Sequence, residues 1–68
     1  MKDLAIKFGL KVRDKRRELG LSQDKLALLA EIDRSYAGRV ERGEVNITLE
    51  KAYQLAEVLE CDLRDILP

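Results

Sequence analysis

Apolar residues recur at intervals of three and four along most of this 68-residue chain, and this is the spacing of residues that share one face of a helix. Glycine and proline number only four and one, and runs of β-branched residues are missing. The pattern therefore favours helices over strands from end to end. We expect an all-α domain with five helices.

The first two predicted helices are separated by residues that typically end and begin helices. One helix runs from about Asp3 to Leu19 and stops at Gly20, a residue type that commonly follows a helix C-terminus. Ser22 can cap a short second helix over Gln23–Ala30. The apolar residues expected on the inner sides of these two helices are Phe8, Val12, Leu19, Leu26, Ala27 and Ala30.

The third predicted helix follows almost at once. Asp33 is a favourable N-cap residue, and Gly43 marks the other end of the helix. Between Ala30 and Arg34 there is room only for a bend of three to four residues. That separation is expected of a helix-turn-helix.

The C-terminal part predicts a longer and a shorter helix. Thr48 caps the fourth helix, and Glu50 in its first turn suits the positive end of the helix dipole. Asp62 caps a last turn or two that ends near Pro68. Because no linker or repeat interrupts the chain, we expect residues 1–68 to form one complete domain.

The third helix separates into two faces when its residues are advanced by about 100° each. Ala37 and Val40 point inward, with Tyr36 and Glu41 at the edges of that face. The opposite face is small, polar and cationic, and consists of Arg34, Ser35, Gly38, Arg39 and Arg42. Such a face suits the DNA major groove, where arginine can donate two hydrogen bonds to guanine. A helix face that is merely solvated is the alternative.

The charge is unevenly distributed along the chain although the net charge is zero. Residues 1–42 carry 11 Lys/Arg and 7 Asp/Glu, a net of +4, whereas residues 43–68 carry 2 and 6, a net of −4. This asymmetry suggests that one end faces a polyanion. Two helical surfaces of ordinary charge would give the same count.

Composition also excludes several classes of function. With one cysteine and no histidine, the chain can form neither an internal disulfide, nor a zinc site, nor a histidine acid/base pair. No apolar stretch near the N-terminus could serve as a signal peptide or span a bilayer. We expect a cytoplasmic protein that is not an enzyme and that needs no metal, cofactor or small-molecule ligand.

Three segments carry a resemblance to a known family. The run GLSQDKLA at 20–27, DRSY at 33–36 and VERG at 40–43 resemble the Cro/repressor-type (XRE) helix-turn-helix family. The resemblance extends from about Phe8 to Leu67 and implies a lambda-repressor-like fold. DRSY and the later EVNIT at 44–48 are also similar to the controller proteins of restriction-modification systems, which is a narrower match.

The resemblance implies a role for individual residues. The residues expected to read bases are Arg34, Ser35 and Arg39. The residues expected to contact the DNA backbone are Gln23, Tyr36, Arg42 and Asn46, although Tyr36 could equally belong to the edge of the core. The family pattern also pairs Arg16 with Glu41 as a structural ion pair, and two separate surface charges are the alternative.

The sequence departs from the family at three positions. Glu31 and Glu60 stand where glycine is commonly found, so a left-handed backbone there would be strained. Gly38 lies within the third helix, where glycine costs roughly 0.5–1 kcal/mol relative to alanine. It therefore indicates a place where DNA or another backbone comes close.

The fourth helix is more apolar than a one-sided surface helix requires. A homodimer interface is predicted in the C-terminal part, formed by Ile47, Tyr53, Val58, Leu63 and Ile66. A two-fold dimer would present two recognition helices to half-sites about one helical turn apart. The alternative is that the domain uses these residues in its own core. Cys61 is expected to be a small, buried residue between the last two helices.

Two functions are consistent with these features. The first is a transcription regulator of a bacterium or phage, bound to double-stranded DNA as a homodimer on a two-fold-symmetric operator. The second is a helix-turn-helix module, such as an antitoxin or adaptor, whose main partner is a protein. Because the third helix offers Arg34, Ser35 and Arg39 rather than aromatic or aliphatic anchors, the sequence favours the first.

Overall fold

The structure is a computed structural model that describes residues 2–68 of the chain. It contains α1 (Lys2–Glu18), α2 (Gln23–Ala30), α3 (Arg34–Glu41) and α4 (Leu49–Val58), followed by a single 3₁₀ turn, η1 (Leu63–Asp65). The all-α prediction is confirmed for the described residues. The count of five helices is not confirmed, because the predicted last turn after Asp62 is a single 3₁₀ turn, with hydrogen bonds from residue i+3 to residue i such as Ile66 N to Leu63 O at 3.1 Å.

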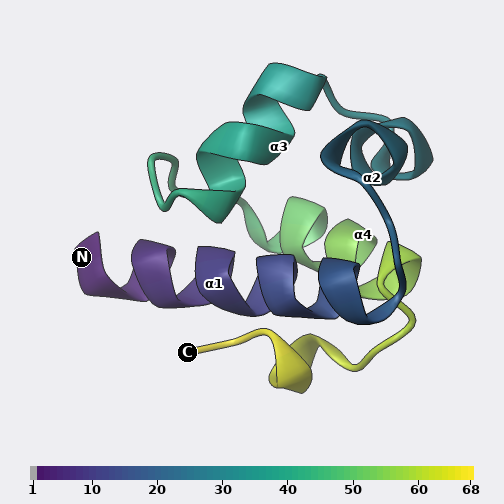
Figure 1. The fold of residues 1–68 in the computed structure, drawn as a ribbon. Helices are drawn as coiled ribbons and strands as arrows, with labels where there is room; N and C mark the ends of the chain where they lie inside the picture. Colours follow the sequence, from purple (N-terminus) through teal and green to yellow (C-terminus); the bar gives the residue numbers. More distant parts are fainter. Residues whose placement is uncertain (1) are drawn as a thin grey trace.

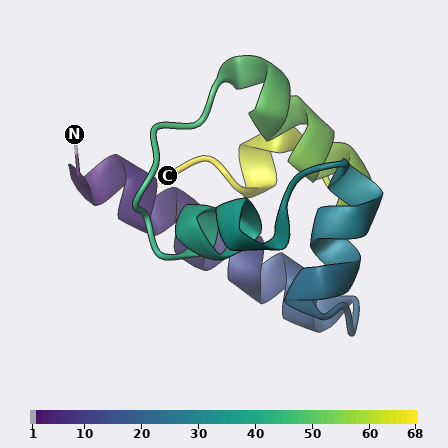
Figure 2. The same cartoon turned by 90° about the horizontal axis from the view of Figure 1, so that it is seen from above.

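The helices form two levels. In Figure 1, α2 and α3 lie on one side of α1, and the C-terminal segment with η1 lies on the other. Seen from above, α4 lies across the molecule from α1, and the loop after α3 leads to it (Figure 2). None of the helices within residues 2–68 combines the length and the apolar character needed to cross a membrane.

One hydrophobic core joins all these elements. Val12 of α1 and Ile66 after η1 are completely buried, and Leu26 of α2 is 1% exposed. The full cluster is Phe8, Val12, Leu26, Ala30, Val40, Ala52, Leu55, Ala56, Leu59 and Ile66. The predicted inner faces of the first three helices are confirmed except at Leu19, which is 39% exposed because it follows the last residue of α1 and lies in the turn.

Side-chain caps begin two of the helices. The Ser22 hydroxyl accepts a hydrogen bond from the backbone N–H of Lys25 at 3.0 Å, and the Thr48 hydroxyl accepts one from Lys51 at 3.2 Å. Asp33 occupies the N-cap position of α3, but its side chain forms no cap hydrogen bond. The predicted N-cap position of Asp33 is therefore confirmed.

Glu31 and Glu60 adopt left-handed backbone conformations, with φ of 58° and 56°. After α2, Glu31 N donates to Leu28 O and Ile32 N donates to Ala27 O, and the same pattern follows α4 at Glu60 and Cys61. These paired hydrogen bonds satisfy the last carbonyls of each helix. Two glutamates thus occupy positions where glycine would carry no steric cost.

Helices α1 and α3 approach each other unusually closely at Gly9. A Cβ atom on Gly9 would overlap with the backbone carbonyl groups of Val40 and Glu41. The last turn of α3 therefore rests directly on the backbone of α1. This close approach fixes the height of α3 above the core, and no local pattern in the sequence indicates it.

Candidate nucleic-acid interface

The outer face of α3 forms one wall of a shallow hollow of about 350 Å³. Six residues line it: Gln23, Arg34, Ser35, Gly38, Arg39 and Arg42. Five of them belong to α3 or to its C-terminal cap, and Gln23 is the first residue of α2. The structure thus brings together all three predicted base-reading residues and two of the four predicted backbone contacts. We refer to this hollow as the α3 groove.

Gly38 lies at the bottom of the α3 groove. It is buried, and a Cβ added there would lie 3.1 Å from Arg42 Nη1 and 3.6 Å from Gln23 Oε1. The glycine therefore leaves space for two polar side chains that face the groove. The expected place of Gly38 on the outer face of α3 is confirmed. The atoms that approach it most closely belong to the side chains of Arg42 and Gln23, and not to another backbone segment.

Two arginines of the α3 groove form ion pairs with nearby carboxylates. Arg34 Nε lies 2.8 Å from Asp24 Oδ1, and Arg42 Nε lies 2.8 Å from Glu44 Oε2. All four side chains are more than half exposed. Such pairs contribute little to stability and exchange easily with solvent or with another anion. Within the described residues, Arg39 forms no ion pair and is exposed.

The hydrogen bond between Arg42 and Glu44 affects both groups. Because the Arg42 guanidinium donates to it, the pKa of the Glu44 carboxyl is lowered, and the positive charges of Arg42 and Arg39 contribute in the same direction. The same hydrogen bond raises the pKa of Arg42. At neutral pH the C-terminal end of the groove therefore carries a carboxylate among its guanidinium groups.

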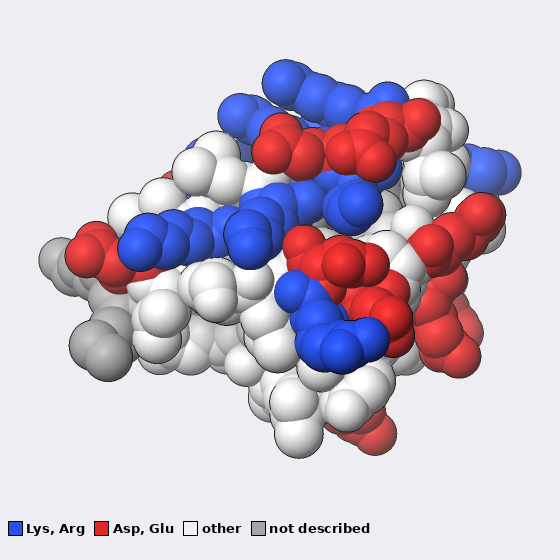
Figure 3. Space-filling model, turned by 90° about the horizontal axis from the view of Figure 1, so that it is seen from below, with Lys and Arg blue, Asp and Glu red and all other residues white. Residues whose placement is uncertain are grey.

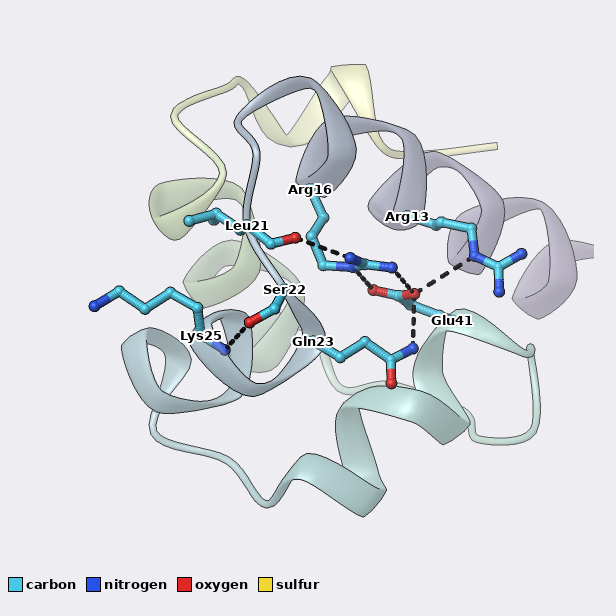
Figure 4. A network of polar contacts seen from close by, with 7 residues as sticks. All are labelled: Arg13, Arg16, Leu21, Ser22, Gln23, Lys25 and Glu41. Carbon is cyan, nitrogen blue, oxygen red and sulfur yellow. Dashed lines mark hydrogen bonds and ion pairs between the residues drawn. The ribbon is translucent and has the colours of Figure 1, made fainter.

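A buried carboxylate connects the three helices that hold the groove (Figure 4). The Glu41 side chain is completely buried, whereas the sequence placed it at the edge of the inner face. Arg16 donates from Nε to Glu41 Oε2 at 2.6 Å and from Nη2 to Oε1 at 3.0 Å. The ion pair that the resemblance implied is thus present, as a bidentate contact between α1 and α3. Bidentate pairs are the strongest hydrogen-bonded contacts between arginine and a carboxylate.

Two further side chains reach Glu41. Gln23 Nε2 donates to Glu41 Oε1 at 3.0 Å, and Arg13 Nε lies 3.7 Å from the same oxygen (Figure 4). No role was predicted for Arg13. It lies on the same side of α1 as Arg16, three residues later, which is the spacing of neighbours on a helix. That spacing was the signal in the sequence that could have identified Arg13.

The comparisons with known proteins agree with this geometry. The family model described as Helix-turn-helix matches residues 12–66. The chain belongs to the helix-turn-helix family. The resemblance to XRE-type proteins is confirmed, and the chain is a DNA-binding transcription regulator rather than an enzyme.

Three proteins with known names align with nearly the whole chain. It is 32% identical to the control protein C.BamHI of Bacillus amyloliquefaciens over 66 residues, which are 96% of this chain and 82% of that protein. It is 31% identical to the control protein C.MunI of a Mycoplasma species, over 97% of this chain and 90% of that protein. The crystal structure of the restriction-modification controller protein C.AhdI of Aeromonas hydrophila matches with a TM-score of 0.89 and 43% identity, over 93% and 96% of the two chains.

Two residues that the family resemblance implied as backbone contacts lie outside the α3 groove. Tyr36 is partly buried and packs against the hydrophobic core. Asn46 is exposed in the loop before α4, beside an apolar hollow that also touches Phe8 and Ile47. The structure therefore separates them from the other five predicted DNA contacts.

The residues predicted for a dimer interface also occupy different environments. Tyr53 is 58% exposed, whereas Ile47, Val58 and Leu63 are partly buried against the core. Ile66 is completely buried, so its place in the interface is corrected, because its side chain has no surface to offer a partner. Further exposed apolar residues nearby are Leu4, Leu49 and Leu67.

Cys61 is partly exposed and forms no disulfide. Burial raises the pKa of its thiol, and the negative charge of Asp65 adds to the effect. The reactive thiolate is therefore scarce at neutral pH. The expectation that Cys61 is a small residue in the connection after α4 agrees with this environment, although it is less buried than expected.

Proposed function

We propose that this chain is the controller protein of a restriction-modification system, and that it binds a two-fold-symmetric DNA operator as a homodimer. The α3 groove supports the DNA-binding part of the proposal, because it gathers six polar or small residues, five from the outer face and C-terminal cap of α3 and one from the start of α2. The three relatives carry the narrower assignment, since each is named as a control or controller protein and matches nearly the full chain.

The proposal assigns two kinds of DNA contact to the groove, contacts to base edges and contacts to phosphates. Arg34, Ser35 and Arg39 line this groove, and in the proposed complex they contact base edges once α3 enters the major groove. Gln23 and Arg42 flank them and contact phosphates, which position the helix without carrying sequence information. In the proposed complex, the Glu41 hydrogen bond holds the Gln23 side chain in its place at the start of α2.

The homodimer is supported by a second, apolar hollow on another part of the surface. It has a volume of about 420 Å³ and lies between α1, the loop before α4 and the C-terminal residues. Exposed apolar side chains border it, and Leu49 is the most exposed of these at 67%. The face turned away from α3 shows a broad area without charged side chains beside a region of mixed charge (Figure 3). An apolar hollow bordered by exposed apolar side chains is typical of a protein interface.

The experiment that tests the proposed function is selection from a random duplex library at about 0.15 M salt, followed by titration of the enriched site. We expect a two-fold-symmetric motif that the protein binds far more tightly than random duplex. A motif without symmetry would contradict the dimer. Failure to enrich any motif, with only weak and salt-sensitive binding, would overturn operator recognition and favour a protein partner.

A further inference from the structure

The carboxylate of Glu44 lies directly at the C-terminal end of the α3 groove. Arg42 caps α3, and its guanidinium meets Glu44 through two atoms, Nε to Oε2 at 2.8 Å and Nη2 to Oε1 at 3.4 Å. The Glu44 backbone N–H donates to Arg39 O at 2.9 Å, which holds this residue beside the end of the helix. The contact is therefore anchored at both ends by the fold.

We propose that Glu44 is an internal competitor for the DNA backbone, occupying the edge of Arg42 that would otherwise bind a phosphate. This inference rests on the proposed function, because Arg42 is there a phosphate contact. Glu44 would thereby help to set the affinity for DNA, although it does not line the α3 groove and no role was predicted for it from the sequence.

The geometry of the guanidinium explains why the two anions compete. Arginine binds carboxylates and phosphates through the same pairs of N–H groups. In the free protein, Nε and Nη2 of Arg42 face Glu44, and Nη1 lies beside Gly38. Glu44 uses the Nε–H and one Nη2–H of the five N–H groups of Arg42. A phosphate at the groove must therefore displace the carboxylate or bind the remaining N–H groups of Nη1 and Nη2, and in both cases it meets the negative charge of Glu44.

The competition acts equally on every DNA sequence. Arg42 contacts the backbone in the proposed complex, so its availability changes binding to operator and to random duplex by the same factor. Glu44 also lies near Arg39, whose charge helps to lower the pKa of the Glu44 carboxyl. The carboxylate thus remains ionised at neutral pH and weakens the positive field of the groove as a whole.

The test compares Glu44→Gln with wild type by fluorescence anisotropy on the selected duplex and on random duplex, at several salt concentrations. We expect Glu44→Gln to bind both duplexes about threefold tighter, as an exposed ion pair would allow, with a salt dependence steeper by up to about one. The matched control is Glu57→Gln, which makes the same change of charge on an exposed α4 residue with no ion pair in the described part of the chain.

A double mutant separates competition from general charge. In an Arg42→Ala background, Glu44→Gln should lose most of its gain, because the competing partner is gone. Three results would overturn the proposal. They are an equal gain in affinity from Glu57→Gln, an undiminished gain from Glu44→Gln in the Arg42→Ala background, and a gain in affinity for the selected duplex alone. Circular dichroism of each variant verifies that the helices are retained.

A measurement without DNA distinguishes this proposal from the proposed function. Inorganic phosphate is titrated while the Nε–H signal of Arg42 is followed by NMR, and Glu44→Gln should respond at a lower phosphate concentration than wild type. Identical titrations would overturn the competition even if the protein binds an operator. Failure of wild type to bind any duplex would overturn the proposed function, while the phosphate titration would still decide the role of Glu44.

Discussion

Arg39 and Arg42 lie three residues apart and line the same groove, but we expect Arg39 to contact a base and Arg42 to contact a phosphate. Arg39→Ala should relax the preference at one base position at a cost of roughly 1–3 kcal/mol, because a base-edge contact carries sequence information. Arg42→Ala should weaken binding to all sequences and reduce the salt slope by about one. Titrations of operator and random duplex across salt concentrations measure both effects. Equal losses on the two duplexes for both variants would refute the assignment.

The two left-handed glutamates offer a second prediction at the scale of single residues. Glu31→Gly and Glu60→Gly should each stabilise the domain by about 1 kcal/mol, since glycine adopts a positive φ without the clash of a Cβ. Urea denaturation followed by circular dichroism measures the change in the free energy of unfolding. Glu57→Gly, within α4, is the matched control and should instead destabilise the domain. A loss of stability at Glu31 and Glu60 would show that their side chains make contacts that outweigh the strain.

At the scale of elements, Glu41 determines how α1, α2 and α3 are held together. Glu41→Gln should destabilise the domain by about 3 kcal/mol. The substitution removes the negative charge of Glu41 and leaves the guanidinium of Arg16, which is only 11% exposed, without a partner of opposite charge. Glu44→Gln removes an exposed ion pair and should cost under about 1 kcal/mol, which makes it the control. Urea denaturation of both variants gives the comparison. Similar losses for the two would mean that Glu41 is as dispensable as a surface charge.

Local signals in the sequence predicted most of the elements, because caps and turns depend on neighbouring residues. Ser22 and Thr48 cap their helices as expected, and the spacing from Ala30 to Arg34 gave the helix-turn-helix. The composition of the α3 groove followed from the 100° periodicity of one helix together with the family resemblance. These features require no knowledge of which helix packs against which.

Features that depend on contacts between distant elements could not be predicted in this way. The need for glycine at Gly9 arises only where the last turn of α3 meets α1. The spacing of Arg13 and Arg16 places both on one side of α1, but the approach of Arg13 to Glu41 arises only where α3 packs against α1. Ile66 fills the core although its segment is a 3₁₀ turn, so an apolar residue near the C-terminus was wrongly assigned to a partner.

At the scale of the whole molecule, the net charge of zero constrains how DNA is bound. Long-range attraction to a polyanion is weak without an excess of positive charge, so in the proposed complex affinity must come from the local face of α3 and from the pairing of two subunits. The apolar surface at Leu49 and Tyr53 and the cationic α3 groove involve different residues. A dimer therefore doubles the number of groove contacts without covering them.

The dimer itself is open to a direct test. Leu49→Glu should raise the dissociation constant of the homodimer by at least about tenfold, because a charge would be placed without a partner on an apolar interface. Sedimentation velocity over a range of protein concentrations measures the monomer-dimer equilibrium, and operator affinity should fall in parallel as monomers lose the second half-site. Leu28→Glu on α2 is the control, since Leu28 is 69% exposed and does not border the apolar hollow, and it should sediment like wild type. A wild-type protein that stays monomeric at high concentration with and without DNA would contradict the dimer, and an unaffected Leu49→Glu dimer would place the interface elsewhere.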